Sequence, residues 1–320
     1  MRKRILESGT YLENIKKFAR NEIVLIVLVF LIILFGCCHD VFFTVNNILN
    51  IGRQLAQLAI ISCGMTMLII GGNIDLSVGS TYSLAGVLGA LVMQLTKSWI
   101  LGILAALSIG IIVGFINGIL TAKGKIPSFL TTLATMGIIR GISMIITGTK
   151  DVLVFEETYL KIFSDGTLFR VPSQIFWLII VAGISIFILN WTTLGKYIYA
   201  IGGNRVSARF CGLNVDRIII SLFIMGGIFA ALSGMIQVSL LHAARPSLGY
   251  GLELNAIAAT ILGGTSLHGG IGKIRGTIIG ALTVTVLNNG LLLFGLRTFV
   301  QQIIVGIVII LAILFIRRGE

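Results

Sequence analysis

Long apolar stretches alternate with short polar connections along the chain, and this pattern predicts helices that cross a membrane. An apolar helix needs roughly 20 residues to cross a bilayer, so the shorter stretches must be tilted, extended or broken. We expect about ten spans, with a separate short interfacial helix over Val45–Arg53. The predicted spans are Ile23–Phe35, Leu55–Ile70, Val78–Leu95, Ile100–Thr121, Pro127–Thr147, Ile175–Asn190, Ile218–Leu241, Leu252–Gly263, Gly276–Leu296 and Val300–Ile316.

The longest polar break covers residues 194–217 and reads LGKYIYAIGGNRVSARFCGLNVDR. Gly202–Gly203 are expected to interrupt it after a short aromatic turn, and Asn204 stands where a helix N-cap belongs. The run Arg205–Cys211 then predicts one short helix, closed by Gly212. A loop whose charges only fix topology would explain the basic residues, but not the capped helix. The sequence of residues 194–217 therefore favours the interpretation that this loop docks a soluble partner.

Composition and charge define the class of protein. The chain of 320 residues is 56% hydrophobic and 11% charged, and its mean hydropathy of +1.04 excludes an ordinary soluble globule. The formal net charge of +12 would by itself suggest nucleic-acid binding, but the positions of the basic residues give another explanation. Sixteen of the 24 basic residues fall on the side of the N-terminal segment 1–22, seven fall on the other side, and Arg140 lies within a span. This asymmetry predicts that both termini are cytoplasmic and that no nucleic acid is bound.

A second informative stretch, GGNIDLSVGS at Gly71–Ser80, separates two apolar segments. It is not a phosphate-binding loop, because no Gly-Lys-Ser/Thr follows its glycines. One interpretation is that Asp75 caps the helix that begins near Leu76 or Ser77. The other is a broken helix that lines a polar pathway with Asn73, Asp75 and Ser77. The two interpretations are compatible, and both stay open.

Other polar residues inside apolar stretches have two possible roles. The amides Asn117, Asn255, Asn288 and Asn289 either bridge helices or line a route for a hydroxylated solute. Arg140 either reaches toward the membrane surface or pairs with a carboxylate. The cysteines and histidines show no spacing typical of a disulfide framework or a metal site, so no metal is expected.

Glycine spacing predicts helix contacts. Small residues four apart leave a smooth helix face against which another helix can pack. The glycines with this spacing are Gly110, Gly114 and Gly118, and also Gly276 and Gly280. A weak internal echo, Ile69–Gly72 with Ile261–Gly264, suggests a repeat in which both Gly-Gly pairs end helices that run in the same direction.

Four segments carry a resemblance to a known family: GGNIDLSVGS, KIPSFLTTLATMGIIRG, YIYAIGGNRVSARFCGLNVDR and LNAIAATILGGTSLHGGIGKIRGTIIGAL. They resemble the membrane permeases of bacterial ABC importers of the ribose-type branch, whose relatives import pentoses, hexoses, galactosides and the autoinducer furanose. The resemblance extends over almost the whole chain, and its motifs occur in the family's order.

The resemblance implies an all-α integral membrane protein of the bacterial cytoplasmic (inner) membrane, with a single transmembrane domain over residues 1–320. It implies a homodimer of permeases, a cytoplasmic ATPase that binds the ATP, and a sugar-binding protein outside. The chain itself would be no enzyme and would hold no cofactor. The residues expected to couple to the ATPase are Tyr199, Gly202, Gly203, Asn204, Arg205, Arg209 and Gly212.

Two departures from the family pattern matter. Relatives often carry an acid just after Gly-Gly-Asn, where this chain has Arg205-Val206. Relatives also often carry Asp where this chain has Asn255, which removes a buried charge.

The expected function is import of a sugar, such as ribose or another pentose or furanose, by alternating access powered by the separate ATPase. The sequence does not choose the sugar. An ion-coupled secondary transporter of a small polar solute is the alternative, because it too would use a broken helix and a buried carboxylate. It would leave the capped central loop without a role. An intramembrane enzyme is disfavoured, because neither paired carboxylates nor a nucleophile motif is present.

Overall fold

The computed structural model describes residues 24–168, 170–296, 300–304 and 306–307. The N-terminal segment 1–22 and most of the predicted last span lie outside these residues. Within the described chain, seven helices are long and apolar enough to cross a membrane. They are α2 (Val45–Ile70), α3 (Val78–Thr96), α4 (Trp99–Ala122), α5 (Ser128–Thr147), α7 (Ser173–Trp191), α10 (Val215–Leu241) and α12 (Ile274–Leu293).

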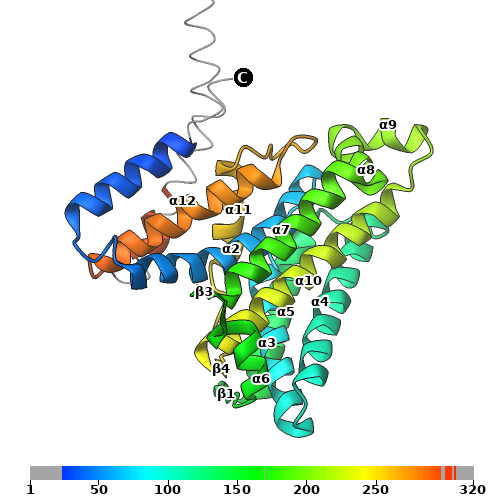
Figure 1. Cartoon of the computed structure of the whole chain (residues 1–320). Coiled ribbons are helices and arrows are strands. Elements are labelled where there is room, and N and C mark those ends of the chain that lie inside the picture. The colour runs from blue at the N-terminus through cyan, green and yellow to red at the C-terminus, as the bar shows by residue number, and fades with distance from the viewer. Residues whose placement is uncertain (1–23, 169, 297–299, 305, 308–320) are drawn as a thin grey trace, which may run out of the picture.

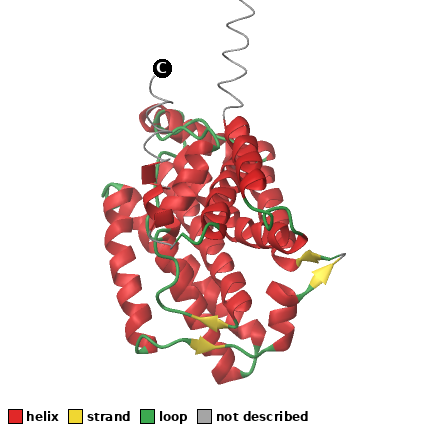
Figure 2. Ribbon diagram, turned by 90° about the vertical axis from the view of Figure 1, so that its left-hand side faces the viewer, coloured by secondary structure: helices red, strands yellow, loops and turns green. Residues whose placement is uncertain are grey.

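Shorter elements connect or flank these helices (Figure 1). The apolar helix Val24–Cys38 packs against α12 through a cluster that includes Phe35 and Leu287. The remaining helices are α6 (Glu157–Leu160), the π-helix η1 (Lys161–Asp165), α8 (Thr193–Gly203), α9 (Arg205–Phe210) and α11 (Leu252–Leu262). Two antiparallel strand pairs complete the fold (Figure 2). They join β1 (Val152–Leu153) to β4 (Ala243–Ala244) and β2 (Thr167–Leu168) to β3 (Val171–Pro172).

Helix α10 forms the centre of the bundle, where it packs against α2, α3 and α4. Side chains such as Met65, Leu68 and Phe223 are fully buried between these helices. In contrast, only 28% of the apolar window of α4 and 22% of that of α5 is buried within the chain. Because the exposed side chains of α4 and α5 are mostly aliphatic, these helices present their outer faces to lipid or to another subunit.

Glycines set the closest helix contacts, as their spacing predicts. A Cβ atom at Gly114 would lie only 2.3 Å from the carbonyl oxygen of Phe223, so a side chain there would push α4 away from α10. The glycines of α12 meet α11 in the same way. The confirmed contact glycines are Gly110, Gly114 and Gly118 on α4, and Gly276 and Gly280 on α12.

The predicted interfacial helix at Val45–Arg53 is wrong as a separate element, because α2 continues through it without a break. Gly52 does not end the helix. A Cβ atom there would lie 2.9 Å from Cδ1 of Ile175, so this glycine serves the contact with α7. Arg53 is accommodated by donating a hydrogen bond to Oδ1 of Asn50 at 2.7 Å.

The bundle has two chemically different ends. Helices α8 and α9 lie at one end, and β1, β4 and α6 lie at the opposite end (Figure 1). At the α9 end, many basic residues accompany Asp216: Lys123, Lys125, Lys196, Arg205, Arg209, Arg217, Lys273 and Arg275. At the opposite end, four acids offset the basic residues: Asp151, Glu156, Glu157 and Asp165. The excess of positive charge therefore belongs to the α9 end.

Candidate functional site

The break between α2 and α3 begins with a glycine turn. The N–H of Gly71 donates to the carbonyl oxygen of Met67, and the N–H of Asn73 donates to that of Leu68 at 2.9 Å. These bonds satisfy the last carbonyl groups of α2. Gly72 has a φ of +72°, a conformation that residues with a side chain rarely adopt, so the second glycine makes this turn possible.

Asp75 lies buried in the break and accepts two hydrogen bonds through Oδ1. The donors are the N–H of Ser77 at 2.7 Å and the Ser77 hydroxyl at 2.6 Å. Nδ2 of Asn117 on α4 donates to the Ser77 hydroxyl oxygen at 2.9 Å. The expectation that Asp75 caps a helix beginning near Leu76 or Ser77 is wrong, because α3 begins at Val78 and its N-cap is Ser77, whose side chain makes no cap hydrogen bond. Asp75 instead accepts from Ser77 itself and so holds the turn that leads into α3.

Two hydroxyl groups of α5 hold the backbone of the break. The Ser128 hydroxyl accepts from the N–H of Ile74 at 3.1 Å, and the Thr132 hydroxyl accepts from the N–H of Leu76 at 3.0 Å. The sequence analysis missed both residues. Their spacing of four on one helix face was the available signal.

Arg205, the first residue of α9, reaches the same break. Its Nη2 donates to the carbonyl oxygen of Gly72 at 2.6 Å, to Oδ1 of Asn73 at 2.8 Å and to the carbonyl oxygen of Gly71 at 3.3 Å. Burial lowers the pKa of the Arg205 guanidinium from its ordinary value, and repulsion by Arg209 lowers it further. The structure thus joins one residue of the predicted coupling set to one residue of the predicted pathway.

The two glycines at the end of α8 form a tight junction with other segments. A Cβ atom at Gly202 would lie 1.7 Å from the carbonyl oxygen of Ile70, the last residue of α2. That oxygen accepts from the N–H of Gly270 at 2.8 Å. The Tyr199 hydroxyl, whose pKa burial raises, donates to the carbonyl oxygen of Gly272 at 2.8 Å. The ends of α2 and α8 and the α11–α12 connection therefore meet at one point.

The expectation that Gly202–Gly203 interrupt the loop after an aromatic turn is wrong, because both glycines belong to helix α8. Gly202 is needed for close approach to α2 rather than for a turn. The chain leaves the helical conformation at Asn204, which is extended.

Helix α9 is capped as predicted. The Asn204 side chain accepts from the N–H of Ser207 at 3.0 Å, and Gly212 has a φ of +82° just beyond the helix. Arg209 forms an ion pair with Asp216, the acid in the first turn of α10. These contacts fix the short helix at the basic end of the bundle.

Two apolar side chains of α9 project away from the chain. The exposed fraction is 64% for Val206 and 88% for Phe210. An exposed aromatic side chain on a short, ordered helix is typical of a protein–protein contact. The sequence analysis did not single out these two residues, although their spacing of four places them on one face of the helix.

A cavity of about 420 Å³ lies beside α9, between the α4–α5 connection and the start of α10. Lys125, Arg205 and Arg209 line it together with a single acid, Asp216. The glycine turn contributes Gly72 and Asn73 to its wall. The excess of positive charge in the cavity suits an acidic group of a partner.

The predicted pathway amides lie elsewhere. Asn289 on α12 and Asn47 on α2 exchange two buried hydrogen bonds, at 2.9 and 3.0 Å, so Asn289 bridges helices. Oδ1 of Asn288 is buried without a partner in the described chain. Asn255 is a half-buried residue in the first turn of α11. Among the described residues, no hydrogen bond joins these three amides to Asn73, Asp75 and Ser77. Their pathway role stays a prediction.

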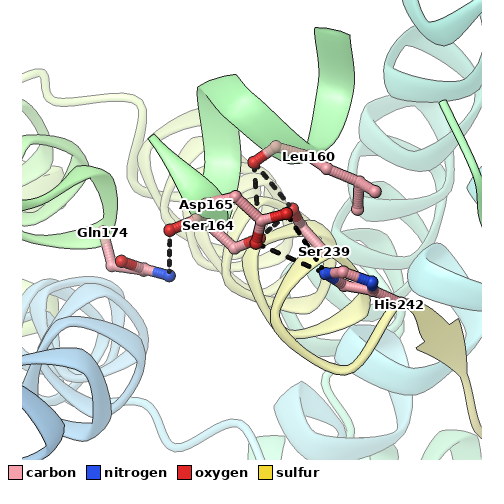
Figure 3. A network of polar contacts seen from close by, with 6 residues as sticks. All are labelled: Leu160, Ser164, Asp165, Gln174, Ser239 and His242. Atoms are coloured by element: carbon pink, nitrogen blue, oxygen red, sulfur yellow. Dashed lines mark hydrogen bonds and ion pairs between the residues drawn. The ribbon is translucent and has the colours of Figure 1, made fainter. Parts of the chain in front are cut away.

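A polar network closes the opposite end of the bundle (Figure 3). The hydroxyl groups of Ser164 on η1 and Ser239 on α10 lie 2.8 Å apart. Nε2 of His242 lies 3.3 Å from the carboxylate of Asp165, and Gln174 of α7 donates to the carbonyl oxygen of Ser164 at 3.3 Å. The network fastens η1 to the end of α10. In the part of the chain that the structure describes, no group of three potential ligands could hold a metal ion.

Comparison with known proteins identifies the family. Residues 47–313 match the family model described as branched-chain amino acid transport system / permease component. The ribose import permease protein of Escherichia coli K12 is 41% identical over 293 residues, which cover 91% of each chain. The ribose import permease protein of Bacillus subtilis 168 is 39% identical over 289 residues, 90% of each chain. The L-arabinose transport system permease protein of Escherichia coli K12 is 36% identical over 298 residues, 92% of this chain and 90% of that protein. The chain therefore belongs to the family of branched-chain amino acid transport system permease components.

Proposed function

We propose that the chain is the membrane-spanning permease subunit of an ATP-driven importer of a sugar, with ribose or another pentose or furanose as the solute. Two of the relatives named above are ribose import permeases and one is an L-arabinose permease, and each matches about nine tenths of the chain. The contact between Arg205 and the glycine turn carries the mechanistic part of the proposal, because it links the exposed helix α9 directly to the broken segment of the bundle.

The charge distribution orients this permease in the bacterial cytoplasmic membrane. The basic end with α9 faces the cytoplasm, in keeping with the positive-inside rule, and the end with the β1–β4 pair faces outward. Ten spans follow when the helix Val24–Cys38, α11 and the C-terminal stretch from Val300 are added to the seven long helices. Both termini are then cytoplasmic, and the chain forms a single transmembrane domain.

A cytoplasmic ATPase docks on α9 and supplies the energy. The exposed Val206 and Phe210 give it an apolar contact, and the neighbouring basic cavity receives an acidic side chain. The permease binds no nucleotide and catalyses no reaction of its own. A second copy of the permease and a sugar-binding protein on the outer side complete the complex.

Transport follows from coupled movement. When ATP brings the two ATPase subunits together, α9 moves with them and Arg205 displaces the turn at Gly72 and Asn73. That turn leads directly into the segment of Asp75 and Ser77, which contacts α4 through Asn117. The two permease copies then rock about their shared axis, so that the solute pathway opens alternately to each side.

The test is uptake of radioactive ribose by proteoliposomes that contain the permease with the ATPase and the sugar-binding protein of its own system. We expect uptake to require enclosed ATP and to persist when an uncoupler removes the ion gradients. Uptake that proceeds without ATP and stops with the uncoupler would instead establish the ion-coupled secondary transporter.

A further inference from the structure

A charged and aromatic cluster lies between α5 and the beginning of α11, apart from the residues considered above. The guanidinium carbon of Arg140 lies 3.3 Å from the centre of the Tyr250 ring, which corresponds to a cation–π contact. Glu253, in the first turn of α11, is 91% buried, since only 9% of its surface is exposed.

Polar atoms of this cluster have no partner in the described part of the chain. Nε and Nη2 of Arg140 and Oε2 of Glu253 are buried without a hydrogen bond. The other carboxylate oxygen of Glu253 accepts from the N–H of Gly251 at 3.3 Å. Buried ionisable groups are normally paired, because an unpaired one loses its hydration without compensation. The cluster therefore has unused capacity both to donate and to accept hydrogen bonds.

Close backbone packing holds the carboxylate in this position. A Cβ atom at Gly79, in the first turn of α3, would lie 2.5 Å from Oε2 of Glu253 and 2.3 Å from the carbonyl oxygen of Gly249. Gly249 and Gly251 have φ values of +85° and +77°, which few residues other than glycine adopt. The three glycines Gly79, Gly249 and Gly251 thus allow the backbone around Tyr250 and the Glu253 carboxylate to pack closely against α3.

The cluster lies deep in the bundle and opens on one side. Arg140 follows Ser128 by twelve residues on α5, which places it about 18 Å from that end of the helix. Tyr250 as a whole residue is 53% exposed. Charged groups at such a depth face a water-filled path or another subunit rather than lipid.

We infer that Arg140, Tyr250 and Glu253 form a contact site for the solute within the membrane, and that the solute is a hydroxylated one such as a pentose. The inference deepens the proposed function and rests on it. A carboxylate accepts hydrogen bonds from sugar hydroxyl groups, a guanidinium donates to hydroxyl and ring oxygens, and an aromatic ring packs against the C–H groups of a sugar. Neither Arg140 nor Tyr250 belongs to the segment that α9 contacts, so the site is separate from the coupling contact.

The experiment compares the reconstituted complex of the parent chain with two variants. Glu253→Gln keeps the shape of the site but removes its charge. Thr277→Val is the matched control, because it removes a buried hydrogen bond, that of Thr277 with Thr66 at 2.6 Å, between two residues that are not part of the proposed site. Four quantities are measured: ATP hydrolysis stimulated by the loaded binding protein, ribose moved per ATP, the change in melting temperature on addition of ribose to the purified permease, and the oligomeric state of the purified permease.

For Glu253→Gln we expect near-normal ATP hydrolysis but about tenfold less ribose moved per ATP, because a charge-assisted hydrogen bond to the solute is lost. Ribose should raise the melting temperature of the parent and of Thr277→Val, but not that of Glu253→Gln. The inference would be overturned if Glu253→Gln moved as much ribose per ATP as the parent and if ribose raised its melting temperature as much as that of the parent. It would also be overturned if Glu253→Gln only shifted the permease from dimer to monomer. A parent complex that moves neither ribose nor another pentose or furanose with ATP would refute the proposed function itself.

Discussion

At the scale of single residues, the break between α2 and α3 combines two kinds of interaction. Asp75 is engaged locally by Ser77, whereas Asn73 is engaged over a long sequence distance by Arg205. The first interaction holds the turn that leads into α3, and the second fastens the preceding glycine turn to α9. For a substitution at either residue, measurements of stability and of transport can therefore separate a loss of folding from a loss of transport.

Substitution of Asp75 tests whether its charge serves transport. Asp75→Asn keeps an oxygen acceptor for both bonds from Ser77, so it should cost at most about 1 kcal/mol of folding stability. Asp75→Ala removes the acceptor and should cost about 0.5–2 kcal/mol. We expect Asp75→Asn to melt like the parent yet to take up about tenfold less sugar, because it lacks the charge that binds hydroxyl groups strongly. Normal uptake by a well-folded Asp75→Asn protein would reduce the residue to a structural role in the turn before α3.

Substitution of Arg205 tests the proposed coupling. Arg205→Lys keeps the positive charge for docking, but an ammonium group does not reproduce the guanidinium contacts with Gly72 and Asn73. ATPase association should remain within about twofold of the parent, while sugar moved per ATP should fall several-fold. Arg209→Lys is the control, since Arg209 pairs with Asp216 and does not touch the turn. Equal coupling in the two variants would contradict the proposed role of Arg205.

At the scale of elements, two helices end in the same way. Gly71–Gly72 end α2 and Gly263–Gly264 end α11, and in each pair the second glycine has a positive φ, +72° and +83°. The two ends lie near each other, because the carbonyl oxygen of Ile70 accepts from Gly270 in the connection after α11. The weak echo in the sequence thus corresponds to two equivalent helix ends at the basic end of the bundle.

The two glycines of α8 should respond very differently to alanine. A methyl group at Gly202 would overlap the carbonyl oxygen of Ile70, whereas nothing lies within 4 Å of a Cβ atom at Gly203. We expect Gly202→Ala to destabilise the permease by about 2 kcal/mol or more, through displacement of α8 from α2. Gly203→Ala should be neutral or stabilise by up to about 1 kcal/mol, because alanine favours the helix. Thermal unfolding in detergent provides the measurement, and similar melting temperatures for both variants would exclude the tight junction.

At the scale of the whole molecule, the positive end, the exposed residues of α9 and the cavity beside it lie together. The broken segment starts at the same end, so a movement imposed on α9 has a short route into the bundle. The opposite end is fastened by the β1–β4 pair and the network of Asp165 and His242. This asymmetry suits a permease that receives its energy from the cytoplasmic side.

The docking surface can be tested in the assembled transporter. Phe210→Ser should weaken ATPase association about tenfold or more, because a central aromatic contact is lost from the interface. The melting temperature of the isolated permease should not change, since Phe210 is 88% exposed. The adjacent Cys211→Ser, also at an exposed position, serves as the control. Retention of the ATPase by Phe210→Ser at the parent's affinity would place the docking surface elsewhere.

The sequence by itself determined the features that depend on local chemistry. Apolar length located the seven long helices to within a few residues at most ends; the start of α2, placed too late at Leu55, is the main exception. Asn204 and Gly212 bounded α9, because capping preferences act within one turn. The spacing of Gly114 and its neighbours predicted a contact face, since that periodicity belongs to a single helix.

Only the tertiary structure decided which distant segments meet. The sequence suggested that Gly202 interrupts its segment, but Gly202, like Gly52, lies inside a helix and allows a neighbouring element to approach closely. The contact of Arg205 with the glycine turn joins residues more than 130 positions apart, and the cluster of Arg140, Tyr250 and Glu253 joins α5 to α11. Such contacts depend on how helices pack around α10, and no local propensity encodes that packing.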